Sequence, residues 1–287
     1  MKRPLAVALT LAAFTLAHSA AAPAHAETAP SPAARLVSDV KGVRAGEPFM
    51  IGVLIEIPDG WHVYWKGTGG TGIPTTLELS LPRGFKADEV LYPTPARFTN
   101  AAQTTTGYDK AVLLSARITP PADLANVSSV SIGVRAGWLC CDEERCVPGD
   151  AELAFAVPVV AATTRDADGA ALIETWRARL PREIVKGSGV ELSNAKGLAP
   201  GAKKGRLEAT LTLPEEARKP DVFAAAPDAL DVLKVAAKLD GKTVLVALDV
   251  EVLEGQKLES AALEVVLAYE TLGGERRGIR FSLPLRN

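Results

Sequence analysis

The sequence predicts an all-β fold: an immunoglobulin-like β-sandwich, then a short helix, then a second, smaller β-sandwich. Short runs of alternating apolar and polar residues, broken by Pro, Gly and Asp, recur along the chain. This pattern is typical of antiparallel sandwiches. Only residues 168–180 have the spacing of an amphipathic helix. A mature length of about 260 residues suits two domains better than one.

The first 26 residues have the pattern of a secretory signal peptide. Lys2 and Arg3 precede an alanine-rich apolar run, and Ala24-His25-Ala26 provides an A-x-A cleavage site. The run is shorter than the ~18 apolar residues that a membrane span needs. We therefore expect a mature chain that begins near Glu27 in the periplasm and has no membrane span. A retained, uncleaved anchor is the alternative.

The first sandwich is expected over residues 27–162. Its strand-like runs are residues 49–57, 76–81, 111–118, 130–140 and 153–159. Within residues 60–66, alternation places Trp61 and Trp65 on one face and Tyr64 on the other.

A helical linker is expected over residues 163–186, where Pro181 stops the helix. The second sandwich is expected over residues 187–287. Its strand-like runs are 206–213, 230–238, 243–250, 262–269 and 279–283, with Asp240-Gly241 and Gly273-Gly274 as hairpin turns.

The charge balance argues against nucleic acid and anionic lipid as partners. Without Lys2 and Arg3 the formal net charge of -2 becomes about -4. Such a chain lacks the basic surface that phosphates attract. Proteins or small molecules are the expected partners, and no cofactor is expected.

All three cysteines lie in the stretch WLCCDEERCVPG, residues 138–149. If residues 130–141 form one regular strand, Cys140 is buried beside Trp138 while Cys141 faces outward. Cys141 is then the better candidate for chemistry. Residues 142–150 are expected to connect two strands of a hairpin, with Cys146 on the connection and Pro148-Gly149 turning the chain.

A bond between Cys141 and Cys146 would stabilise the fold only weakly. It closes a loop of about six residues, for which chain entropy gives ~2 kcal/mol. This favours a redox role, although a small structural clip stays open as an alternative. Acidic residues at 142–144 raise a thiol pKa, so the pair suits a disulfide that a partner's thiolate attacks.

Several motifs occur in a fixed order: GWHVYWK at 60–66, YPTPARF at 92–98, GYDKAVLL at 107–114 and GWLCCDEERCVPGDAEL at 137–153. Together they resemble the periplasmic N-terminal domain of the thiol:disulfide interchange protein DsbD. They are most similar to the DsbD-like domains of the copper-sensitivity suppressor ScsB.

The resemblance implies an immunoglobulin-like domain that shuttles electrons between a thioredoxin-like partner and oxidised exported proteins. It assigns the redox pair to Cys141 and Cys146, and Cys140 falls on a variable position as a buried third thiol. It places Tyr64 beside the disulfide and Phe98 in the cap segment that shields it. The chain would then be a protein-disulfide reductase component.

Full-length relatives add a membrane domain and a thioredoxin-like domain, and this sequence shows neither. We therefore expect separate partners: thioredoxin-like periplasmic proteins and, as a further candidate, a membrane electron conductor. Copper tolerance is a candidate setting.

Two alternatives stay open. One is a non-catalytic periplasmic binding or scaffold module whose disulfide is structural. The other is a copper-binding protein that uses its cysteines together with His62, although no metal site is expected because Cys140 and Cys141 are adjacent. Hydrolysis is disfavoured, since His62 is the only histidine after the leader and no G-x-S-x-G motif occurs.

Overall fold

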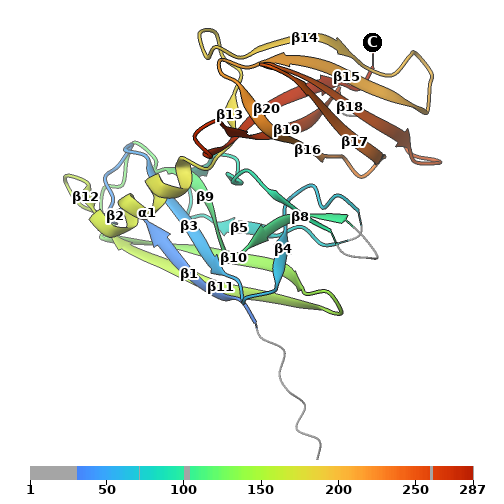
Figure 1. Cartoon of the computed structure of the whole chain (residues 1–287). Helices are drawn as coiled ribbons and strands as arrows, with labels where there is room; N and C mark the ends of the chain where they lie inside the picture. Colours follow the sequence, from blue (N-terminus) through green and yellow to red (C-terminus); the bar gives the residue numbers. More distant parts are fainter. Residues whose placement is uncertain (1–30, 71, 100–103, 259–260, 287) are drawn as a thin grey trace, which may run out of the picture.

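The computed structural model describes residues 31–70, 72–99, 104–258 and 261–286. The chain forms β-sheets throughout this part, with one α-helix at the side (Figure 1). The prediction of an all-β fold is confirmed. The expected signal peptide lies outside the described residues.

The first region contains two sheets packed face to face. One has the strand order β1-β3-β9-β6, and the other has the order β11-β10-β4-β8-β7, with β5 also paired to β10. A two-strand sheet of β12 and β2 lies beside them. The strands are β1 (Ala33–Ser38), β2 (Val40–Gly42), β3 (Phe49–Glu56), β4 (His62–Tyr64), β5 (Thr76–Ser80), β6 (Lys86–Ala87), β7 (Ala96–Thr99), β8 (Thr104–Asp109), β9 (Ala111–Thr119), β10 (Ser129–Cys141), β11 (Cys146–Pro158) and β12 (Thr164–Arg165).

Strand alternation builds the first core. Ile132, Val134 and Trp138 on β10 face the same way and are buried in one apolar cluster, as the period of a strand requires. Ile51 on β3 and Ile118 on β9 meet them from the opposite sheet. Burying each such side chain contributes roughly 1.5–3 kcal/mol, so this inward face fixes the register of β10.

The second region is also a pair of sheets. Their strand orders are β13-β20-β19-β16 and β14-β15-β18-β17. The strands are β13 (Arg182–Glu183), β14 (Glu191–Lys196), β15 (Lys204–Thr212), β16 (Ala217–Ala225), β17 (Leu230–Asp240), β18 (Thr243–Val252), β19 (Ala262–Thr271) and β20 (Arg276–Pro284). A separate apolar cluster fills the space between them, with Leu207, Leu248 and Val265 fully buried. We call this second region the C-terminal domain.

Helix α1 (Ala167–Arg177) packs against the first region. The side chain of Asp166 caps its start by accepting a hydrogen bond from the Gly169 amide, and Ile173 and Trp176 are buried. The helix ends earlier than residue 180. The amides of Arg179 and Leu180 bond to carbonyls three residues back, a tight last turn that leads into Pro181.

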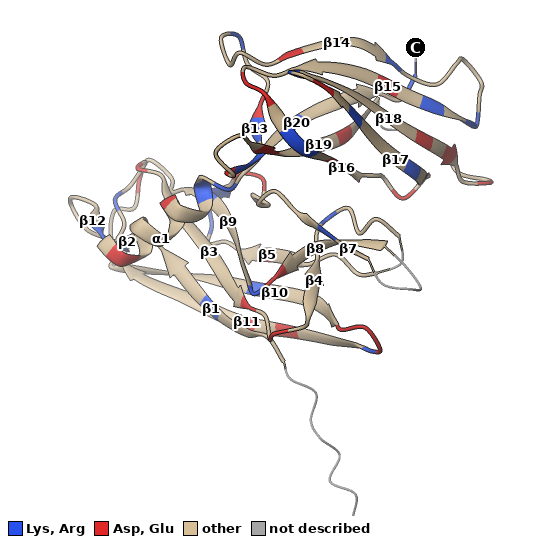
Figure 2. Ribbon diagram, viewed as in Figure 1, with Lys and Arg blue, Asp and Glu red and all other residues tan. Residues whose placement is uncertain are grey.

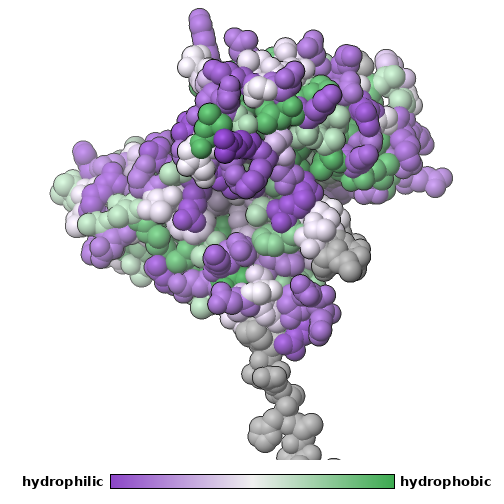
Figure 3. Space-filling view, viewed as in Figure 1, coloured by the Kyte–Doolittle hydropathy of each residue, from purple (hydrophilic) through white to green (hydrophobic). Residues whose placement is uncertain are grey.

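The surface shown in Figure 3 is mostly hydrophilic, with apolar side chains gathered on the C-terminal domain. Its exposed large apolar residues include Leu233, Leu245 and Leu272. No helix among the described residues is long and apolar enough to cross a membrane.

Candidate redox site

Cys141 and Cys146 form a disulfide at the tip of the β10–β11 hairpin. Cys141 is the last residue of β10, Cys146 is the first of β11, and the two are directly opposed in the ladder. Their Cα atoms are 4.1 Å apart. The disulfide therefore joins two residues that the main chain already brings together.

The turn between them is shorter than expected. The carboxylate of Asp142 accepts hydrogen bonds from the amides of Glu144 and Arg145, both at 2.8 Å. These bonds hold the pKa of Asp142 below its usual value. The amide of Asp142 also donates to the carbonyl of Arg145 at 3.0 Å. Because these bonds close the turn within residues 142–145, the expected connection over residues 142–150 is wrong, and Pro148 and Gly149 lie inside β11.

The two sulfur-bearing residues differ in exposure. Cys141 is 1% exposed, whereas Cys146 is exposed at the start of the edge strand β11. The expectation that Cys141 faces solvent is wrong, because its face of β10 is covered by residues of β4 that lie far away in sequence. Of the two bonded cysteines, Cys146 is therefore the one exposed to solvent.

Tyr64 covers the buried sulfur. Its hydroxyl lies 3.3 Å from Sγ of Cys141, and it must be the donor because a disulfide sulfur carries no proton. Burial raises the pKa of Tyr64, so the phenol keeps its proton at neutral pH. Trp61 and Trp65 belong to the first core and Tyr64 does not, which confirms the predicted alternation.

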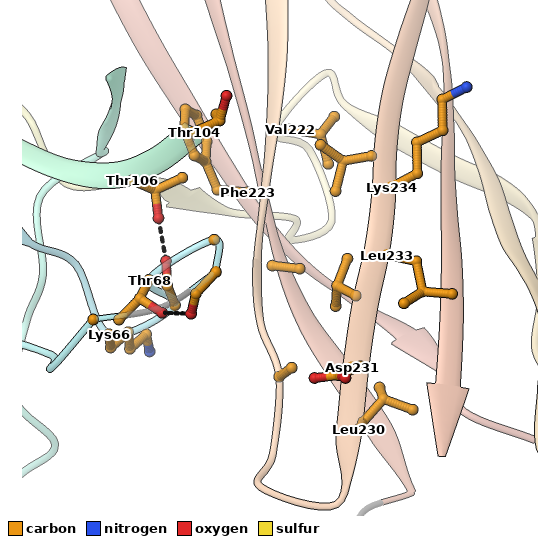
Figure 4. Close-up of a pocket in the computed structure, with 18 of the residues that line it drawn as sticks. Lys66, Thr68, Thr104, Thr106, Val222, Phe223, Leu230, Asp231, Leu233 and Lys234 are labelled. Carbon is orange, nitrogen blue, oxygen red and sulfur yellow. Dashed lines mark hydrogen bonds between the residues drawn. The ribbon is translucent and has the colours of Figure 1, made fainter. Parts of the chain in front are cut away.

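A glycine-rich loop, which contains Gly67, Gly69, Gly70 and Gly72, packs on the ring of Tyr64. At Gly72, whose φ is +150°, an added Cβ would overlap the tyrosine ring. The loop also lines a cavity of about 580 Å³ between the two domains, with Thr68 and Thr106 on one side and β17 on the other (Figure 4). Tyr64 thus contacts both the Gly72 backbone, through its ring, and Cys141, through its hydroxyl.

His62 and Phe98 lie beside this arrangement. His62 is the cross-strand neighbour of Cys141, and its ring stacks on Phe98 with centroids 4.8 Å apart. Its Nε2 lies 3.2 Å from the hydroxyl of Thr105. Burial lowers the pKa of His62, against the opposing effect of Asp142, so the imidazole is neutral at pH 7. The sequence grouped His62 with the cysteines only in the copper-binding alternative; the strand pairing places it directly opposite Cys141.

Cys140 lies on the opposite face of β10. It is a free thiol, fully buried in the first core beside Trp138. Burial, with the nearby charge of Asp142, raises the pKa of this thiol to about 11. Cys140 therefore stays protonated at neutral pH.

Charge at the hairpin tip is mostly negative (Figure 2). Glu143 and Glu144 are exposed, while Arg145 pairs with Asp142 at 3.5 Å and lies over the ring of Trp61. In the described part of the chain no group of three or more His, Cys, Asp or Glu side chains could hold a metal ion.

Comparisons with known proteins agree with this geometry. The family model of the N-terminal region of thiol:disulfide interchange protein DsbD matches residues 31–158. Among solved structures, the N-terminal periplasmic domain of ScsB from Proteus mirabilis aligns with a TM-score of 0.60 at 16% identity, covering 88% of this chain and 92% of that one.

A protein of unknown function from Porphyromonas gingivalis W83 aligns at 12% identity over 88% of this chain and 99% of that one. Its TM-score of 0.25 is too low to support an argument. No curated protein sequence matches the chain. The disulfide, Tyr64 and strand β7 all lie within the matched range, and residues 31–158 form a DsbD-like N-terminal domain.

Proposed function

We propose that this protein is a periplasmic thiol:disulfide exchange protein whose working group is the Cys141–Cys146 disulfide. It takes electrons from a thioredoxin-like protein and passes them to oxidised exported proteins. The observation that supports this most is the asymmetry of the bond: one sulfur is exposed and the other is buried against a phenol donor. We assign the activity to residues 27–162, with residues 163–186 as a link to a second domain at 187–287.

The exposure of the two sulfurs sets the order of the steps. A thiolate of the partner attacks Sγ of Cys146, forms a mixed disulfide and releases Cys141 as a thiolate. The hydroxyl of Tyr64 donates its hydrogen bond to that developing charge. The partner's second thiol then attacks its own sulfur in the mixed disulfide and releases Cys146. Two electrons and two protons have moved to this chain, and the partner holds the new disulfide.

Phe98 and His62 shield the bond between encounters. Phe98 stacks on His62, which in turn is the neighbour of Cys141 in the sheet. A partner whose cysteine approaches the disulfide must displace Phe98 and His62. Such a cap limits reaction with thiols that cannot bind the surrounding surface.

Trapping a mixed disulfide tests the order of attack. In a Cys140→Ala background, Cys141→Ala leaves the exposed Cys146 free to hold a thioredoxin-fold protein whose resolving cysteine has been replaced. The matched variant, Cys146→Ala, should trap far less, because Cys141 is buried. Equal trapping through Cys141 contradicts the order. If the oxidised wild type proves inert toward every reduced thioredoxin-fold protein, the function itself is wrong.

A structural disulfide is the second candidate function. A clip between two already opposed residues is compatible with the geometry. The measured reduction potential separates the two, since structural disulfides lie below about -300 mV and exchange proteins lie above that value.

We propose copper tolerance as the setting of the exchange, on the strength of the resemblance to ScsB-type domains. Loss of the chain should then increase sensitivity to copper, and a variant lacking both Cys141 and Cys146 should not restore tolerance. Restoration by that variant contradicts a thiol role.

A further inference from the structure

We propose that Asp221, in the C-terminal domain, is a positioning residue for the redox site. Through Arg97 it holds strand β7 in place and so keeps Phe98 over the site. The C-terminal domain thereby sets how readily the disulfide is reached. This inference rests on the proposed function of the Cys141–Cys146 pair.

Arg97 and Asp221 form a bidentate ion pair between a guanidinium and a carboxylate. Nε of Arg97 lies 3.0 Å from each carboxylate oxygen of Asp221, and Nη2 lies 2.6 Å from Oδ1. Nη2 also donates to the carbonyl of Val222 at 2.8 Å. The guanidinium lies 5.3 Å from the ring centroid of Phe223. Such bidentate, stacked contacts fix both distance and orientation.

A β-bulge places Asp221 for this contact. The pairing of β16 with β19 shifts between Arg218 and Asp221, and Lys219 within the shift has a φ of 46°. A left-handed conformation is uncommon for a residue with a side chain, and bulges redirect the side chains that follow them. Asp221 is 28% exposed and reaches across to the other domain.

Strand β7 transmits the contact to the site. Among the described residues it is an edge strand, and its one neighbour in the sheet is β8. Successive residues of a strand face opposite ways, so Arg97 meets the C-terminal domain while Phe98 meets His62. A short edge strand has few bonds of its own to hold it. Two further contacts hold the strand from the C-terminal domain: Nη2 of Arg276 donates to the carbonyl of Pro95 at 2.6 Å, and Arg97 also bonds to the carbonyl of Val222. Loss of the Asp221 contact therefore weakens the hold on Phe98 without freeing the strand.

The glycine-rich loop is supported from the same side. Lys66 pairs with Glu264 of the C-terminal domain at 2.7 Å. An added Cβ at Gly67 would overlap the carbonyl of Ala224, so the two backbones are in close contact. Phe223, Val266 and Ala268 of the C-terminal domain also belong to the apolar cluster of the first region, and the cavity of Figure 4 lies beside these contacts. Strand β7 and the glycine-rich loop thus both contact the C-terminal domain.

The test uses the full chain and Asp221→Asn, which keeps the shape of the side chain and removes its charge. The second-order rate constant for reduction by dithiothreitol should rise about fivefold, the effect of a modest weakening of one contact. Asp249→Asn is the matched control. It breaks a comparable two-bond contact with Arg206 inside the C-terminal domain and should leave the rate constant unchanged.

A charge exchange provides the second variant. Arg97→Asp alone should accelerate reduction, and Arg97→Asp with Asp221→Arg should return the rate constant toward that of the wild type. A thermal melt of each protein confirms that it is folded. If both single variants are folded and react at the wild-type rate, the positioning role is wrong.

The two proposals fail separately. If Asp221→Asn changes nothing while the wild type still exchanges with a thioredoxin-fold protein, only the positioning role is lost. If dithiothreitol reacts faster with Asp221→Asn but no thioredoxin-fold protein reduces either form, the positioning role stands and the exchange function is wrong.

Discussion

Replacing Tyr64 by phenylalanine removes one oxygen atom from the site and should slow reduction of the disulfide about tenfold. The hydroxyl donates to Sγ of Cys141 at 3.3 Å. A hydrogen bond to a charged group contributes about 1.5–3 kcal/mol, and one to a neutral, weakly accepting sulfur contributes less. A difference of ~1.4 kcal/mol between the thiolate and the disulfide corresponds to one factor of ten in rate.

The assay is stopped-flow reduction of the oxidised full chain by a reduced thioredoxin-fold protein, followed at several pH values. Because burial raises the pKa of Tyr64 above its ordinary value of 10.0, the phenol stays protonated through pH 9. The defect of Tyr64→Phe should therefore be constant between pH 6 and pH 9.

Tyr108→Phe is the matched control for this prediction. Tyr108 lies on β8, the strand next to β4, and its buried hydroxyl donates to the carbonyl of Pro93 at 2.8 Å. The substitution removes this hydroxyl. It should lower the free energy of unfolding by about 1–3 kcal/mol, since it leaves a buried acceptor unpaired, and should not slow reduction. A Tyr64→Phe protein that is reduced as quickly as the wild type refutes the role assigned to the hydroxyl.

Four further outcomes are expected. Cys140 should resist iodoacetamide at pH 7 in the folded protein and react once unfolded, because it is buried and its pKa is about 11; intact mass reports the labelling. Burial lowers the pKa of His62 in the folded protein below its ordinary value of 6.5. The imidazole therefore binds a proton more readily in the unfolded chain than in the folded protein, and stability should fall as the pH drops below 6.5. Urea melts at pH 7.5 and pH 5.5 should show a smaller loss for His62→Gln than for the wild type. Gly72→Ala should displace Tyr64, cost about 1–3 kcal/mol in a urea melt and slow reduction as Tyr64→Phe does. Leu248→Ala should cost about 2–5 kcal/mol, because it opens a cavity in the C-terminal core; a cost below 1 kcal/mol contradicts that packing.

Patterns that depend on near neighbours in sequence could be predicted. The alternation along β10 correctly places Trp138 and Cys140 in the first core, because side-chain direction in a strand follows from position alone. The long runs of the second region are found again as β15, β17, β18, β19 and β20.

Features that depend on distant segments could not be predicted. Cys141 is buried because Tyr64 and its strand cover it, and nothing near residue 141 encodes that cover. The pair Pro148-Gly149 indicated a turn, yet the side chain of Asp142 closes the hairpin sooner. Strand β16 was missed because Pro220 and the bulge before Asp221 interrupt its alternation.

The backbone pairing of β10 with β11 around Cys141 and Cys146 bears on how partners bind the oxidised and the reduced protein. The backbone bonds of the hairpin and the aspartate turn do not involve the sulfur atoms, so we expect the oxidised and reduced proteins to have nearly the same shape. A partner that recognises shape alone would then bind the oxidised and the reduced protein equally well. The electron donor and the electron acceptor then compete for the same surface. The direction of electron transfer follows from their relative reduction potentials.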